Sequence, residues 1–230
     1  MALSRTDVGA KASTTGTTIT SNAFTPANNS VIVVVQHVLD NPVAPDTLGM
    51  SGGGLTWTKK LDFSETNLGV HRGAWWVAEV GTGASMTVAG TCTGGGANIE
   101  QELHIFTYTG YQVGNPTGAT GTLSVTTTGT QTLTLSAAPA SSSEVLGASC
   151  ADTGGGVHDD TAGSGFSQRF STSDGVNTQT LSESRTGSTS TAVTYGATTS
   201  NVSAFIAIEI VAAAAGGASP ATLLLMGVGP

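Results

Sequence analysis

Three ionisable side chains alternate along one predicted strand. Glu100, Glu102 and His104 are spaced two residues apart, so in an extended strand they point to the same face. Carboxylates in such pairs cleave glycosides by acid–base chemistry where a ligand can reach them. Because Phe106 and Tyr108 continue the same face, we interpret the three polar residues as the half-exposed polar end of a strand. A glycoside hydrolase is therefore the least favoured of the functions considered.

Two other motifs have the spacing of chemical sites. Residues 49–53, with Ser51 at the centre, match the nucleophile elbow of hydrolases, in which the serine sits between a strand and a helix. The next residues, 54–57, begin with another glycine and cannot open a helix, so we expect a loop without a nucleophile.

The Gly-rich segment 154–160 ends in His158, Asp159 and Asp160, which could ligate a cation. No second group of ligands accompanies them, so we expect a solvated turn and no metal or cofactor. The histidines His37 and His71 lie in strand patterns and are interpreted as structural.

Aromatic residues are the candidates for stacking on a ligand ring. Trp75 and Trp76 are adjacent in a predicted strand and must point to opposite faces, so at least one could be a surface anchor. The candidate stacking residues are Trp57, Trp75, Trp76, Tyr108 and Tyr111.

Composition excludes several classes of protein. Charged residues are 10% of the chain, the net charge is −8 and only seven residues are basic, which argues against nucleic-acid binding. A mean hydropathy of +0.12 with so little charge predicts a folded chain. A surface of hydroxyls favours packing against other copies or partners. Cys92 and Cys150 are expected to be buried thiols, with a disulfide as the alternative.

The chain shows no targeting or membrane signal. The N-terminus lacks the basic and apolar regions of a signal peptide. The longest apolar run, 204–215, contains Glu209 and is too short to span a bilayer. We therefore expect assembly in the cytoplasm and no membrane insertion.

A series of strands occurs twice. Predicted strands at 30–39, 54–63, 70–80, 84–92 and 99–109 are followed by a fainter copy at 143–151, 165–171, 178–185, 191–196 and 202–212. Gly, Asn, Asp and Ser turns separate them. The pattern predicts an all-β fold, a single antiparallel sandwich over 17–212, of about a dozen strands in two pseudo-repeats near 30–109 and 143–212. The run Val31 to Val35 predicts a strand covered on both faces.

The two ends of the chain have different characters. Residues 1–16 are polar and predict an N-terminal arm or a first edge strand. Residues 213–230 combine a flexible spacer with an apolar C-terminal segment. We expect this segment to be an assembly arm that packs on a neighbour, and the alternative is that it folds back on its own sheet. The arm residues are Leu223, Leu224, Leu225, Met226 and Val228.

The order of these motifs resembles a known group of proteins. The segments 54–58, 75–83, 86–91 and 105–111, with the closing strand 204–210, are similar to β-sandwich virion proteins of tailed double-stranded DNA bacteriophages. These are minor tail or capsid decoration proteins, and no catalytic residues carry over from them.

The resemblance implies that the sandwich is jelly-roll-like and that the protein is a non-catalytic structural protein of the virion. Its copies would form a homo-oligomer such as a trimer and dock through edge strands and apolar termini on the tail or the major capsid protein, with a host surface glycan as a further partner. The alternative function is a carbohydrate-binding module or host-surface adhesin.

Overall fold

The computed structural model describes residues 2–13, 16–41, 47–65, 71–94, 98–152, 161–173, 178–198 and 202–214. All regular structure in these ranges is antiparallel β-strand, which confirms the all-β prediction. The strands of the first half are β1 (Ser4–Ser13), β2 (Thr18–Thr20), β3 (Ser30–Asn41), β4 (Thr47–Gly52), β5 (Thr58–Ser64), β6 (His71–Val80), β7 (Val88–Thr93) and β8 (Asn98–Thr109). Those of the second half are β9 (Thr117–Val125), β10 (Gly129–Thr134), β11 (Glu144–Asp152), β12 (Ser167–Ser173), β13 (Thr178–Thr186), β14 (Ala192–Thr198) and β15 (Val202–Ile210).

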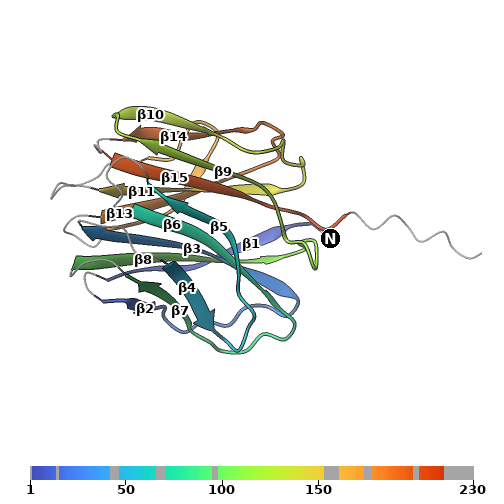
Figure 1. Cartoon of the computed structure of the whole chain (residues 1–230). Helices are drawn as coiled ribbons and strands as arrows, with labels where there is room; N and C mark the ends of the chain where they lie inside the picture. The colour runs from blue at the N-terminus through green and yellow to red at the C-terminus, as the bar shows by residue number, and fades with distance from the viewer. Residues whose placement is uncertain are drawn as a thin grey trace, which may run out of the picture.

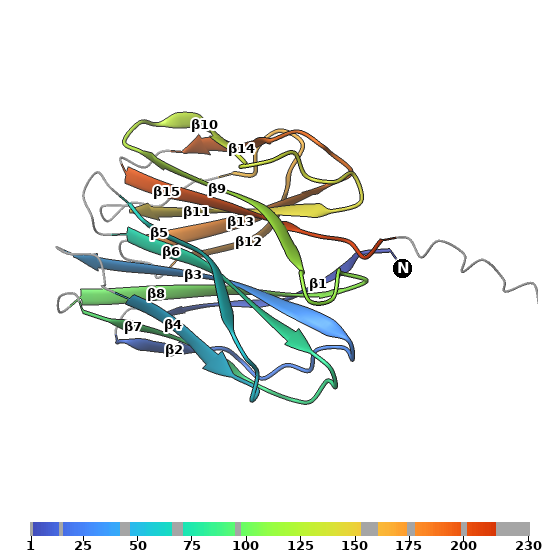
Figure 2. The same ribbon diagram turned by 45° about the vertical axis from the view of Figure 1, so that its right-hand side comes forward.

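The strands form four stacked layers (Figures 1 and 2). Two five-stranded sheets, β1-β8-β3-β6-β5 and β12-β13-β11-β15-β9, lie face to face at the centre. The outer face of the first is covered by the sheet β2-β7-β4, and that of the second by the sheet β10-β14. We call these the central and outer sheets of each half.

Both halves follow the same strand order. The central sheet of the first half has the order β1-β8-β3-β6-β5, and that of the second half has the equivalent order β9-β15-β11-β13-β12, in which β4 has no counterpart strand. In the outer sheet of the second half, the place of β4 is taken by a single bridge between Ala162 and Tyr195. The duplication therefore covers residues 4–109 and 117–210, more than the pattern of apolar runs indicated. The finer jelly-roll description stays a prediction.

The two central sheets meet in the manner of a two-fold symmetric dimer. Strand β1 lies over β12 and its counterpart β9 lies over β5, the counterpart of β12. Likewise, β8 lies over β13, and their counterparts β15 and β6 lie over each other. The counterparts β3 and β11 also lie over each other. Such reciprocal contacts define an isologous interface, which here lies within one chain.

Each central sheet is buried on both faces. Val31, Val33 and Val35 pack toward the second half, whereas Ile32 and Val34 pack toward the outer sheet of the first half. This confirms the two-sided burial predicted from the continuous β-branched run.

Every edge strand of the central sheets is irregular. Each edge strand shifts register once against its neighbour, namely β1, β5, β9 and β12. The four pairings between inner strands have no register shift. The bulge residues include Val8, Lys60 and Arg169. Bulges and charges at an edge discourage pairing with another chain. Of the two predictions for the N-terminal residues, an arm or a first edge strand, the structure shows the edge strand, because residues 4–13 form β1.

Candidate functional site

Three of the four histidines meet in the interior, between the two central sheets. His37, His71 and His104 come from β3, β6 and β8 and are all at most 1% exposed. Glu102 lies beside them on β8 and is equally buried. Hydroxyl groups of β12 and β13 face this cluster from the second half.

Hydrogen bonds join the cluster across the halves. His37 Nδ1 lies 2.8 Å from Thr180 Oγ1, and its Nε2 lies 2.9 Å from His71 Nδ1. The two rings stack with centroids 5.2 Å apart. Glu102 Oε2 lies 3.7 Å from His37 Nδ1. His37 and His71 are therefore structural residues, as predicted.

His104 makes the most complete set of contacts. Its Nδ1 lies 2.9 Å from Ser182 Oγ and its Nε2 lies 2.6 Å from Thr172 Oγ1. Burial, with a smaller contribution from His37, lowers the pKa of His104 to about 3. The ring is therefore neutral near neutral pH and links the two halves through hydroxyl groups.

This position overturns the interpretation of Glu100, Glu102 and His104 as a half-exposed strand end. All three are buried, with exposures of 5%, 1% and 0%. The reason is that β8 belongs to a central sheet, so its polar face lies against the second half rather than water. A substrate at the surface cannot reach these carboxylates.

Four of the five candidate stacking residues are also interior. Trp75 and Tyr108 are 0% exposed, and Trp76 and Tyr111 are 6% and 5% exposed. Trp75 packs toward the second half and Trp76 toward the outer sheet of its own half, because both faces of β6 are covered. The expectation of a surface anchor at these positions is therefore wrong.

Trp57 remains partly exposed, but its ring packs on the core and its Nε1 donates to the Gly52 carbonyl oxygen at 3.2 Å. Tyr111 donates its hydroxyl to Glu79 at 3.1 Å, and burial, followed by Glu79, raises its pKa to about 12. Neither ring stands free.

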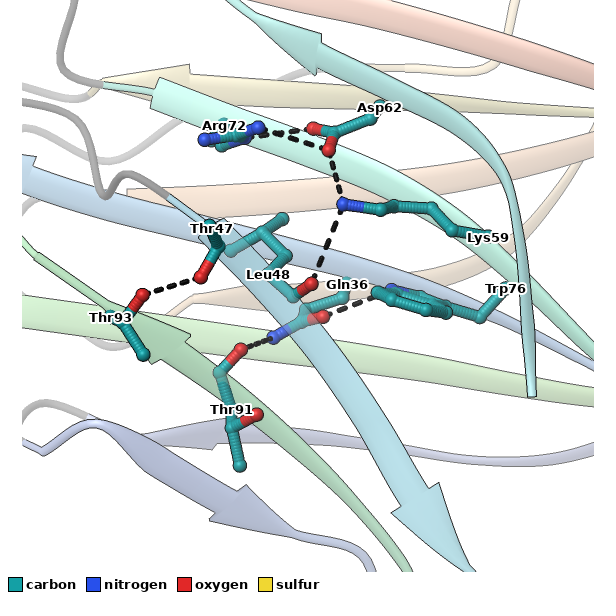
Figure 3. A network of polar contacts seen from close by, with 9 residues as sticks. All are labelled: Gln36, Thr47, Leu48, Lys59, Asp62, Arg72, Trp76, Thr91 and Thr93. Atoms are coloured by element: carbon teal, nitrogen blue, oxygen red, sulfur yellow. Dashed lines mark hydrogen bonds and ion pairs between the residues drawn. The ribbon is translucent and has the colours of Figure 1, made fainter. Parts of the chain in front are cut away.

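A polar network fastens the outer sheet of the first half to its central sheet (Figure 3). Gln36 accepts from Trp76 Nε1 at 3.0 Å and donates to the Thr91 carbonyl oxygen at 3.1 Å. Lys59 pairs with Asp62 and donates to the Leu48 carbonyl oxygen of β4.

Arg72 also pairs with Asp62, at 2.7 Å. Burial acts to raise the pKa of the Asp62 carboxyl, but Arg72 and Lys59 together hold that pKa below its usual value.

The remaining sequence motifs do not form a site. Ser51 lies in β4, which a turn follows, so no nucleophile elbow is present. Cys92 and Cys150 are buried on opposite sides of the first central sheet and are not bonded to each other. Within the described ranges, no group of three or more His, Cys, Asp or Glu residues is arranged to hold a metal ion. His158, Asp159, Asp160 and the arm residues 221–230 lie outside those ranges.

Charge is distributed unevenly over the four layers. The strands of the outer sheets, β2, β4, β7, β10 and β14, contain no Asp, Glu, Lys or Arg, whereas the charged residues of described strands all lie in the central sheets. The outer face of the sheet β2-β7-β4 is formed by residues with small or hydroxyl side chains, namely Thr18, Thr20, Thr47, Gly49, Ser51, Ala89, Thr91 and Thr93. The sheet β10-β14 presents Thr130, Thr132, Thr134, Ala192 and Thr194 in the same way.

Comparisons with family models, curated proteins and solved structures found no match to this chain. In the part of the chain that the structure describes, no helix is long and apolar enough to cross a membrane.

Proposed function

We propose that the protein is a non-catalytic structural component of a bacteriophage virion, a minor tail or capsid decoration protein. The observation that supports this proposal most strongly is that the strands of both outer sheets contain no charged residue, although the chain has a net charge of −8. Exposed strands normally carry charged side chains, and the cores of protein interfaces are depleted of them. Two uncharged faces at opposite ends of the stack therefore favour contacts with other protein surfaces.

The edges of the central sheets also favour assembly through the outer sheets. Bulges interrupt all four edge strands, and charged residues such as Arg5, Lys60 and Arg169 lie on three of them. These features disfavour docking through the edge strands, which the sequence had suggested. Contacts with other copies, or with a tail or major capsid protein, would then use the outer sheets.

The buried position of the carboxylates supports a role without catalysis. Glu100, Glu102 and His104 are the residues of the sequence that could form an acid–base set on one strand. All three are buried, and His104 joins the two halves through Ser182. Contacts between residues distant in the sequence connect all four layers. Such a structure suits a component of a particle that must withstand mechanical load.

The apolar arm at 221–230 completes the proposal. Its sequence, with Leu223 to Met226 in one run, is the support for its docking on a neighbour. Deletion of residues 217–230 should leave the sandwich folded and abolish incorporation into particles.

Substitutions that place charge on the outer faces test the docking surface. Thr20→Lys and Thr132→Lys each put a cation at an exposed position of an uncharged sheet. We expect both to reduce the oligomer seen in sedimentation velocity at a fixed protein concentration. The matched control is Thr58→Lys, an exposed threonine on the already charged strand β5. Equal oligomerisation of all three variants and the wild type would refute docking through these faces.

A further inference from the structure

A groove runs beside the edge strand β1. Two adjoining hollows, of about 540 Å³ and about 50 Å³, share Val8 and Phe24 in their linings. The larger one lies between β1 and β8 on one side and residues 24–27 on the other. Its volume is within the range of pockets that bind small molecules.

The floor of the larger hollow is a patch of hydroxyl groups. Ser4 pairs with Thr109 and Thr6 pairs with Thr107 across β1 and β8, and all four residues line the hollow. Cross-strand partners point to the same face of a sheet and lie about 5 Å apart. The floor thus offers four hydroxyls, each able to donate and accept hydrogen bonds.

The bulge in β1 shapes one end of the groove. Asp7 pairs with Phe106 and Gly9 with Ile105, so Val8 is the extra residue. Neighbouring residues of a regular strand point to opposite faces, yet Asp7 and Val8 both line the larger hollow. Bulges redirect side chains in this way and are over-represented next to binding sites.

Phe24 provides a fixed apolar wall. Its backbone exchanges two hydrogen bonds of 2.9 Å with Met86, and its ring packs partly on the core. The rest of the ring is exposed to the groove. Such a ring can stack on the apolar face of a bound molecule.

The charges favour a neutral ligand. Among the residues that line the larger hollow, Asp7 carries the one charge, and its carboxylate is held by Arg5 at 2.5 Å. No cation lines this hollow to attract a phosphate or carboxylate. A neutral polyhydroxyl molecule matches both the aromatic wall and the hydroxyl floor.

We propose that this groove is a saccharide-binding site, with Phe24 stacking on a sugar ring and Thr6, Thr107 and Thr109 hydrogen-bonding its hydroxyls. The smaller hollow, which reaches Asn22 and Lys11, is too small for a second sugar ring and would accept a substituent of the bound sugar. The site does not depend on the virion role, because it uses β1 rather than the outer sheets.

Titration of the full chain with sugars, followed by amide chemical shifts, tests the proposal. The probes are the methyl glycosides of glucose, galactose and N-acetylglucosamine, and β-linked oligomers of glucose and N-acetylglucosamine. We expect at least one probe to shift the amides of Ser4, Thr6 and Phe24. Tighter binding of an oligomer than of its monomer would indicate a glycan chain as ligand, and equal binding would indicate a single sugar.

Two variants and a control identify the groove. Thr6→Val removes one hydroxyl at nearly constant shape and should weaken binding about fivefold, since one hydrogen bond contributes about 1 kcal/mol. Phe24→Leu should weaken it through loss of stacking, with unfolding curves to confirm that the variant is folded. Thr18→Val, on the outer face of β2, should bind as the wild type does. No shift with any probe, or equal affinities for Thr6→Val and Thr18→Val, overturns the proposal.

Discussion

His104 of the first half and Ser182 of the second half are hydrogen-bonded across the interface between the halves, with Nδ1 2.9 Å from Oγ. The ring is fully buried, and its second nitrogen contacts Thr172 of the same half as Ser182. A single neutral histidine thus bridges the two units of the duplicated fold, and its protonation is linked to their stability.

Acid should destabilise the protein through His104. Its folded pKa of about 3 is below the ordinary value of 6.5, so the unfolded chain binds the proton more tightly. The contribution of His104 to the free energy of unfolding should fall as the pH drops from 6.5 toward 3, by at most about 1.4 kcal/mol per pH unit. Urea unfolding across this range measures it. His104→Gln should show a smaller slope than the wild type, and an identical slope would contradict the assignment.

Alkali should destabilise the protein through Glu183, which is fully buried on β13. Burial raises its pKa to about 8, against the opposing effects of the Gly163 N–H and Arg185. The stability that the protonated form contributes is complete below pH 4.5 and is lost as the pH rises to 8. Between pH 4.5 and 6.5 this loss offsets the gain from His104, so stability should be greatest there.

The variant Glu183→Gln isolates that alkaline effect. Because its side chain stays neutral, the decline in unfolding free energy between pH 6.5 and 8 should flatten. Glu79→Gln, at an exposed position of β6, is the control and should keep the wild-type decline. Parallel curves for the wild type and Glu183→Gln would rule out Glu183 as the source.

Gln36→Leu should destabilise the first half. The substitution leaves the buried Trp76 N–H without its acceptor and the Thr91 carbonyl without its side-chain donor (Figure 3). Each unsatisfied buried group costs about 1–3 kcal/mol, so we expect a loss of about 2–4 kcal/mol in urea unfolding. A loss below about 0.5 kcal/mol, the usual limit for surface substitutions, would show that the network is not structural.

Gly163→Ala should be far more harmful than Gly9→Ala. A Cβ at position 163 would overlap the carbonyl of Thr194 in β14, which is backbone and cannot move aside. A Cβ at position 9 meets nothing within 4 Å. We expect losses above about 2 kcal/mol for the first and within about 0.5 kcal/mol for the second. Similar melting temperatures for the two variants would contradict the close packing at Gly163.

The fold was largely accessible from the sequence because the apolar patterns of the two halves are local. The run Val31 to Val35 indicated a strand covered on both faces, and it is. The same burial at Trp75 and Trp76 was missed, because adjacent aromatics also fit a strand with one wet face. Only the pairing of β6 inside a central sheet distinguishes the two cases.

The polar interior could not be predicted from local patterns. Alternating polar residues such as Glu102 and His104 look the same whether they face water or hydroxyls of another sheet. The partner of His104, Ser182, is 78 residues away, and that of His37, Thr180, is 143 residues away. The groove at β1 was missed because the bulge at Val8 depends on the register with β8, which no local signal specifies.

Immunogold electron microscopy of particles purified from a lysate of the source tests the central claim most directly. Antibodies against this chain should place gold at a regular position on the tail or the capsid surface. The label should be lost from particles made with the double variant Thr20→Lys/Thr132→Lys, and it should remain with Thr58→Lys. Particles without gold, together with soluble chain recovered in the particle-free fraction, would contradict a structural role in the virion.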